Sequence, residues 1–213
     1  MNQPIYHTEI TQGTDEWMSI RQGKVGGSSS AALFVNGKGA DGLGAGAYTL
    51  AYEKAAEIMG LSAWEESWQG NEATERGNEL EPFARQWYER TKFIQVTELG
   101  YITRDWLFGT SPDGLVGTDG MIEIKCPSGK EFIRVAETAK IKPEYISQMQ
   151  WGLWITGRAW CDHLTFHPDA KVQSLIRIHR DEATMAMLDE KTEAFRQLVL
   201  DILTRQGYTG QIG

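Results

Sequence analysis

The sequence has few cysteines and no long apolar run. Its two cysteines, Cys126 and Cys161, show no CxxC spacing, which argues against a zinc cage, an iron–sulfur cluster or a disulfide framework. No apolar run approaches the roughly 18 residues of a membrane span, and the first residues lack the basic start and apolar stretch of a secretory signal. We therefore expect one domain, residues 1–213, in a reducing cytoplasmic compartment and with no membrane partner.

The sequence also lacks an excess of positive charge. It carries 21 Lys and Arg against 29 Asp and Glu, a formal net charge of −8. Phosphate contacts depend on Lys and Arg, so this balance argues against a nucleic-acid binder. The objection weakens if the basic side chains cluster on one surface while carboxylates hold metals or face solvent, because a local field depends on how charge is distributed.

The apolar pattern predicts helices at both ends of the chain and strands between them. Three or four short strands are expected over 93–125, with two more at 161–167 and 172–180. A glycine-rich loop is expected at 36–47. Helices are expected over 15–21, from the serine run 28–30, and over 48–59, 81–90, 130–140, 143–156 and 181–204. This order predicts an α/β fold with a central mixed sheet flanked by helices.

The segment SPDGLVGTDGMIEIKCP, residues 111–127, carries the clearest chemical pattern. Asp113 follows a turn, and Glu123 and Lys125 lie on a strand that we expect to neighbour it. Because side chains alternate along a strand, Glu123 and Lys125 point to one face while Ile124 points into the core. Two acids and a lysine would then converge, a set that can hold Mg²⁺ and orient an attacking water at a phosphodiester.

A simpler interpretation treats Asp113 as a turn residue and Glu123 with Lys125 as a solvated strand pair. The apolar neighbours Met121 and Ile122 favour a core strand instead. The joint pattern therefore favours a site over a surface pair.

Several motifs together resemble a known family. SPDGL, IEIKCP, YISQMQWGLWIT and QGTDEWMSIRQGKVGGSS are similar to the lambda exonuclease or YqaJ-type viral recombinase group of PD-(D/E)XK nucleases. The resemblance implies a single nuclease domain with a restriction-endonuclease-like core. It also implies processive 5′ to 3′ digestion of one strand of linear double-stranded DNA, which leaves 3′ single-stranded tails. Further implications are two Mg²⁺ ions, for which Mn²⁺ can substitute, a homotrimer ring, a single-strand annealing protein as partner, and phage or prophage origin in a bacterial host.

The resemblance also implies roles for individual residues of the catalytic segment. It makes Asp113 and Glu123 metal ligands, with the backbone carbonyl of Ile124 as a further ligand. Lys125 would activate the water, and Gln148 would help to position that water or Lys125. A solvent-facing helix residue is the simpler interpretation of Gln148.

Three more residues are implied outside the catalytic segment. Glu81 would assist the second metal, although Glu79 competes for this role and Pro82 departs from the family pattern. Arg21 and Ser28 match the family's pocket for a 5′-phosphate. A guanidinium can fork onto phosphate, and a serine-capped helix start presents free N–H groups. A plain N-cap is the other interpretation of Ser28.

Other patterns carry less weight. The GxGxxG match at 37–42 follows no predicted strand, so no dinucleotide cofactor is expected. His163 and His167 lack a third ligand nearby and are expected to be core or surface residues. Trp151 and Trp154 are expected in the core, whereas Trp64 and Trp68 are candidates for a DNA or subunit contact.

Two alternative functions stay open from the sequence. One is a site-specific DNA endonuclease of the same fold, which requires base-reading elements. The other is a non-catalytic DNA-end-binding or recombination scaffold whose acids are only structural.

Overall fold

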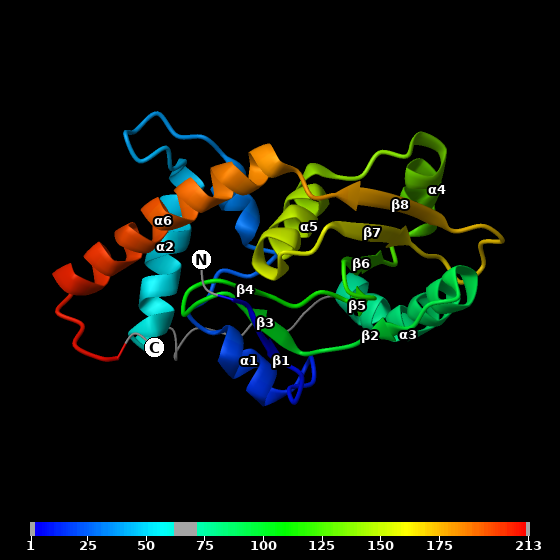
Figure 1. Cartoon of the computed structure of the whole chain (residues 1–213), viewed down its shortest axis with the longest axis horizontal. Helices are drawn as coiled ribbons and strands as arrows, with labels where there is room; N and C mark the ends of the chain where they lie inside the picture. The colour runs from blue at the N-terminus through cyan, green and yellow to red at the C-terminus, as the bar shows by residue number, and fades with distance from the viewer. Residues whose placement is uncertain (1–2, 62–71, 212–213) are drawn as a thin grey trace.

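The computed structural model describes residues 3–61 and 72–211, and over 72–75 it describes the backbone alone. A five-stranded sheet occupies one end of the molecule, and helices α2 (Ala45–Ile58) and α6 (Glu182–Arg205) lie side by side at the other (Figure 1). Within the described residues, no helix has the length and apolar character needed to cross a membrane. Trp64 and Trp68 lie outside the described residues.

The larger sheet is mixed, as predicted. Its central strand β6 pairs in parallel with β7 and antiparallel with β5, and the remaining pairs are antiparallel. In spatial order its strands are β2 (Val96–Thr97), β5 (Gly114–Val116), β6 (Gly120–Lys125), β7 (Trp160–Thr165) and β8 (Ser174–His179). The parallel pair requires a crossover between β6 and β7, which α4 (Gly129–Thr138) and α5 (Pro143–Thr156) provide.

A smaller antiparallel sheet lies beside the larger one. Its strands, in order, are β1 (Ile5–His7), β3 (Tyr101–Thr103) and β4 (Gly109–Thr110). Residues 93–125 therefore form five short strands divided between two sheets, not the predicted three or four. Strands of two or three residues are too short for an alternating pattern to separate from a turn, which explains the difference.

The two faces of β6 meet different helices. Ile122 and Ile124 pack with Ala84 and Tyr88 of α3 (Glu72–Lys92) in one apolar cluster. On the opposite face, Met121 belongs to the larger core cluster together with residues of α5, including the buried Trp151 and Trp154. Glu123 and Lys125 share the Met121 face, because side chains two apart on a strand point the same way.

Helix boundaries follow the predicted signals at most positions. Helix α1 (Asp15–Arg21) is capped by Thr14, whose side chain accepts from the Trp17 N–H. Helix α5 begins at Pro143 and is followed by Gly157 at φ 73°, a backbone angle that favours glycine. Helices α4 and α6 lie within two residues of their predicted bounds.

Three local predictions need correction. Helix α3 begins at residue 72, not 81, and Pro82 lies inside it. Proline cannot donate to a preceding carbonyl, so the helix continues past Pro82 with one backbone hydrogen bond fewer. The serine run leads into a 3-10 helix, η1 (Ser30–Phe34), not an α-helix. Helix α2 begins at Ala45, inside the predicted loop, and the rest of that loop folds back on itself through a Gly37 N–H to Gly42 carbonyl bond of 2.9 Å.

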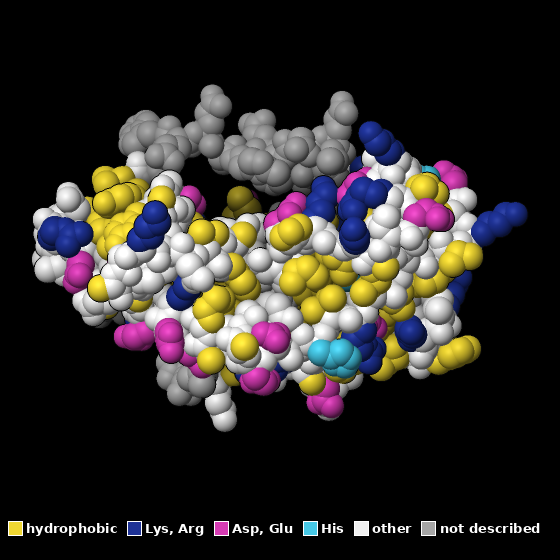
Figure 2. Space-filling view, turned by 90° about the horizontal axis from the view of Figure 1, so that it is seen from above, with side chains coloured by type: hydrophobic (Ala, Val, Ile, Leu, Met, Phe, Trp, Pro, Cys, Tyr) yellow, Lys and Arg dark blue, Asp and Glu magenta, His cyan; other side chains and the backbone are white. Residues whose placement is uncertain are grey.

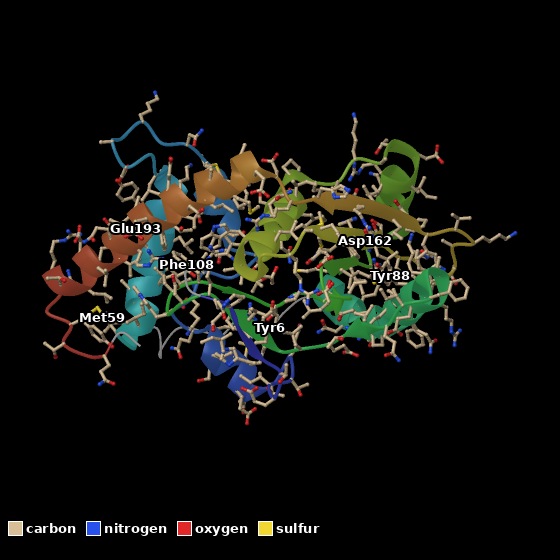
Figure 3. All side chains as sticks on the ribbon, in the orientation of Figure 1. Tyr6, Met59, Tyr88, Phe108, Asp162 and Glu193 are labelled. Atoms are coloured by element: carbon tan, nitrogen blue, oxygen red, sulfur yellow. The ribbon has the colours of Figure 1, made fainter. Side chains whose placement is uncertain are left out.

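A polar network around the buried Asp162 carboxylate fixes α3 against the sheet. Asp162 on β7 is 2% exposed and accepts a 2.8 Å hydrogen bond from the Tyr88 hydroxyl of α3 (Figure 3). Arg177 on β8 forks onto the same carboxylate at 2.7 and 2.9 Å, and its guanidinium stacks on the Trp160 ring. This network ties the helix that carries Glu81 to two strands.

Candidate active site

Asp113, Glu123 and Lys125 meet at one end of the β5–β6 pair. Asp113 directly precedes β5, in which Gly114 lies opposite Ile122 of β6. The Asp113 Oδ2 accepts a 2.5 Å hydrogen bond from the Ile124 N–H, and the Lys125 Nζ lies 2.6 Å from the Glu123 Oε1. The structure therefore brings together the two acids and the lysine, and it places the Ile124 backbone beside both acids.

These residues are not a solvated surface pair. Glu123 is 4% exposed on a strand whose first five residues are all buried, and Asp113 and Lys125 are half-buried. Burying a carboxylate is costly unless it is paired. The Glu123–Lys125 ion pair supplies one partner for this charge.

The electrostatics of the site indicate a shortage of positive charge. Burial raises the pKa of Asp113 well above its usual range, and the negative charge of Glu123 raises it further. Burial lowers the pKa of Lys125, but the charges of Glu123 and Asp113 outweigh it and raise this pKa overall. The lysine is therefore protonated at neutral pH in this arrangement, and its single positive charge faces two acidic side chains.

The donor set fits Mg²⁺. No group of three or more His, Cys, Asp or Glu side chains suited to a metal ion occurs within residues 3–61 and 72–211. Mg²⁺ does not need such a cage, because it keeps several waters and is commonly held by one or two carboxylates. The roles of Asp113, Glu123 and the Ile124 carbonyl as ligands of Mg²⁺ stay a prediction that this chemistry permits.

Glu81 on α3 is electrostatically linked to the site. Burial raises the pKa of Glu81, Arg85 lowers it, and the charge of Glu123 raises it again. The Glu81 carboxylate lies 2.5 Å from the Arg85 guanidinium, which also donates to the Asp113 carbonyl at 3.2 Å. Glu79 is exposed, so the geometry favours Glu81 over Glu79. A role for Glu81 at a second metal stays a prediction.

Gln148 on α5 lies between the segment before η1 and strand β4. Gln148 lies close to Gly27 and Thr110. A Cβ atom added to Gly27, which has none, would stand 3.1 Å from the Gln148 Cγ and 3.7 Å from the Thr110 Oγ1. Gln148 is half-buried, so it is not simply a solvent-facing helix residue. Its contact with the residue next to Ser28 places it near the predicted phosphate pocket.

Arg21 and Ser28 are arranged differently from each other. The Arg21 guanidinium lies 3.8 Å above the Trp17 ring, and the Trp17 indole donates a 2.8 Å hydrogen bond to Ser111, two residues before Asp113. Ser28 is exposed, and the N-cap of η1 is Ser29, so the N-cap interpretation of Ser28 is wrong. The supposed helix dipole at Ser28 is correspondingly weak, because η1 is a five-residue 3-10 helix.

Three residues of the site were not predicted from the sequence. Arg85 lies one helical turn after Glu81, a spacing that favours an ion pair. Tyr145 lies three residues before Gln148 on α5, with its ring centroid 4.9 Å from the Lys125 Nζ. His163 lies opposite Glu123 on the parallel strand β7 and stacks on Tyr145. Only the Arg85 spacing was visible in the sequence, since the other two contacts depend on the crossover between β6 and β7.

Comparison with known proteins identifies the family of this chain. Residues 16–159 match the family described as the YqaJ-like viral recombinase domain. The chain is 37% identical to an alkaline exonuclease, LHK-Exo, from Laribacter hongkongensis, covering 91% of this chain and 98% of that one with a TM-score of 0.74. A structure of LHK-Exo in complex with dAMP gives 34% identity, 92% and 100% coverage and a TM-score of 0.75.

A more distant structure supports the fold alone. A phage related exonuclease from Haemophilus somnus 129PT is 17% identical, with coverage of 86% of this chain and 96% of that one and a TM-score of 0.65. None of the curated proteins compared with this chain matches it. The fold is thus the predicted PD-(D/E)XK type, with a central mixed sheet flanked by helices. The chain belongs to the family of the YqaJ-like viral recombinase domain.

Proposed function

We propose that this chain is a phage-type, Mg²⁺-dependent exonuclease that degrades one strand of linear double-stranded DNA from 5′ to 3′ and leaves 3′ single-stranded tails. The main support is the convergence of Asp113, Glu123 and Lys125 at one end of β6. Further support comes from a relative described as an alkaline exonuclease, with 37% identity over nearly the whole chain.

In this proposal each polar side chain has a defined task. Asp113, Glu123 and the Ile124 carbonyl hold one Mg²⁺, and Glu81 assists a second; Mn²⁺ can take their place. Mg²⁺ held by these residues would supply positive charge for the phosphorus oxygens. Lys125, held by Glu123 at 2.6 Å, orients the attacking water, and Gln148 helps to position it.

The proposal extends to substrate polarity and assembly. Arg21, half-buried above Trp17, and Ser28 take the terminal 5′-phosphate of the degraded strand. Three copies form a ring around the DNA, which makes digestion processive. A single-strand annealing protein then uses the 3′ tail. The family resemblance supports these parts of the proposal.

A digestion experiment tests the activity. Linear duplex DNA with a 5′-phosphate, the same DNA with a 5′-hydroxyl, and a closed circle are each incubated with the protein, with Mg²⁺ or with a chelator. We expect fast loss of the 5′-phosphorylated linear DNA with Mg²⁺, slower loss of the 5′-hydroxyl DNA, and no change in the circle or with the chelator. Cutting of the circle would favour the endonuclease alternative.

Variants test whether the acids act in catalysis. Asp113→Ala and Lys125→Ala should abolish digestion while the far-ultraviolet circular dichroism spectrum is retained. Asp169→Ala is the control, because its carboxylate is 89% exposed in the loop after β7. Unchanged digestion by the first two variants would show that Asp113 and Lys125 are not catalytic, and the absence of digestion by the unmodified protein would favour the non-catalytic scaffold.

A further inference from the structure

A small cavity lies beside Lys125, and neither Asp113 nor Glu123 lines it. It has a volume of about 50 Å³ and lies between strands β6 and β7 and the α4–α5 connection. Its charged lining is Lys125, Glu131, Arg134 and Lys142, and its other polar lining is Tyr145, His163 and Thr165. A water needs roughly 10–15 Å³ of such space, so the cavity has room for several waters or for the oxygens of one phosphate group.

The inner wall of the cavity carries a polar atom without a partner. His163 is 1% exposed, and its Nε2 makes no hydrogen bond. The other ring nitrogen, Nδ1, lies 3.4 Å from the Thr165 Oγ1, and the ring stacks on Tyr145. Buried polar groups without partners are rare and costly in folded proteins. His163 lines the cavity, and this nitrogen is left without a protein partner there.

The outer rim of the cavity is positively charged. Arg134 and Lys142 each form an ion pair with Glu131, at 2.8 and 3.6 Å, so two cations share one carboxylate. Both cations remain about two-fifths exposed. Figure 2 shows the molecule from above the view of Figure 1. On the half of this face that contains α4, Lys and Arg side chains are grouped, with a few carboxylates among them. The rim therefore keeps an uncompensated positive charge beside Lys125.

This chemistry selects an anion over a metal ion. A metal would find one histidine and one carboxylate that is already paired with two cations. An anion would find Lys142 at the rim and the His163 ring nitrogen at the inner wall.

We propose that this cavity is a phosphate subsite, which binds a backbone phosphate of the degraded DNA strand next to the one held at Asp113 and Glu123. The inference rests on the proposed nuclease function, because it takes DNA as the ligand. The subsite shares Lys125 with the catalytic centre. A phosphate bound there would fix the register of the strand while Lys125 contacts the water or the scissile phosphate.

The test compares two lysines of the α4–α5 connection. Lys142→Gln removes the cation at the rim, and Lys140→Gln is the matched control, since Lys140 is exposed two residues away and does not line the cavity. We expect Lys142→Gln to raise the KM for linear duplex DNA about three- to tenfold with kcat little changed. In a chelator, the slope of log Kd against log salt concentration should fall by about 1. Lys140→Gln should match the unmodified protein in each measurement.

A second variant tests the inner wall. His163→Phe keeps an aromatic ring against Tyr145 but removes the nitrogen, and it should also raise KM; a thermal melt checks that it folds. Equal KM values and salt slopes for Lys142→Gln and Lys140→Gln would overturn the subsite. Inhibition by inorganic phosphate that is lost in Lys142→Gln, with DNA binding unchanged, would overturn the DNA assignment in favour of a free phosphate. A wild-type protein that digests no DNA would instead refute the proposed function.

Discussion

At the scale of single residues, the site depends on how the charge of Glu123 is compensated. Glu123 is almost fully buried, and its nearest positive partner is Lys125. Removing one member of a buried ion pair leaves the other charge unpaired, which costs more than removing both members. The pair therefore links catalysis and stability.

A double-mutant cycle tests this link. Lys125→Met should lower the free energy of unfolding of the metal-free protein by about 3 kcal/mol, because the Glu123 carboxylate loses its partner. Adding Glu123→Gln to Lys125→Met should recover most of that loss while activity stays absent. Urea unfolding of the four proteins in a chelator measures the coupling. Additive effects of the two changes would contradict a buried ion pair.

His163 should make the stability sensitive to acid. Its pKa is lowered from 6.5 to about 4 by burial and by the charge of Lys125. The unfolded chain binds a proton at this histidine below about pH 6.5, whereas the folded chain does so only near pH 4, so the contribution of His163 to stability falls as the pH drops through this window. The loss reaches about 3 kcal/mol at most. The raised pKa values of Asp113 and Glu81 act in the opposite direction.

Unfolding measurements between pH 4 and 7 check this prediction. The stability of His163→Phe should fall less between pH 7 and pH 4 than that of the control, because the new side chain binds no proton in either state. His179→Gln, at an exposed position of β8, should keep the dependence of the unmodified protein. A curve for His163→Phe that is as steep as that of the control would contradict the assignment.

At the scale of secondary structure elements, the site is formed where α3 packs against β6. Strand β6 presents Glu123 and Lys125 on the face opposite to Ile122 and Ile124, which pack under α3. Helix α3 brings Glu81 and Arg85 to the same end of the sheet. The buried Asp162 network of Tyr88 and Arg177 attaches this helix to the strands.

Substitutions in this network should loosen α3 and disturb the site from a distance. Asp162→Ala should lower the free energy of unfolding by about 1–3 kcal/mol, because the buried Tyr88 hydroxyl loses its partner while the Arg177 side chain, 42% exposed, is solvated by water. Tyr88→Phe removes one hydrogen bond and should cost about 1 kcal/mol. Glu193→Ala is the control (Figure 3), because the carboxylate that pairs with Arg196 is exposed. This substitution should change the free energy of unfolding by less than about 0.5 kcal/mol. Thermal unfolding measures all three, and an Asp162→Ala protein as stable as the control would refute the network's role.

At the scale of the whole molecule, the net charge of −8 must be reconciled with a DNA substrate. Part of the negative charge lies at the candidate metal site, where cations would neutralise it. Other acids are paired internally, as in the Asp162 network. The total charge therefore does not describe the surface that DNA would meet, which includes Arg134, Lys142 and Lys125.

The proposed ring makes a prediction about mass and processivity. Light scattering should give a molar mass three times that of the chain, and digestion of a long linear duplex should continue on the same molecule after excess competitor DNA is added. Release of the substrate after each cut, or a monomeric mass, would remove the ring from the proposal. The digestion of 5′-phosphorylated DNA itself would not be affected by that outcome.

The sequence by itself determined the fold class, most helix boundaries and the catalytic segment. These features depend on local signals: the proline and glycine that bound α5, the alternation along β6, and the short distance in sequence between Asp113 and Glu123. The tertiary structure alone decided that η1 is a 3-10 helix and that α3 continues through Pro82, because packing overrides local propensity at both places. It also decided the placement of Tyr145 and His163 beside Lys125, because the parallel pairing of β6 with β7 joins residues about 40 positions apart.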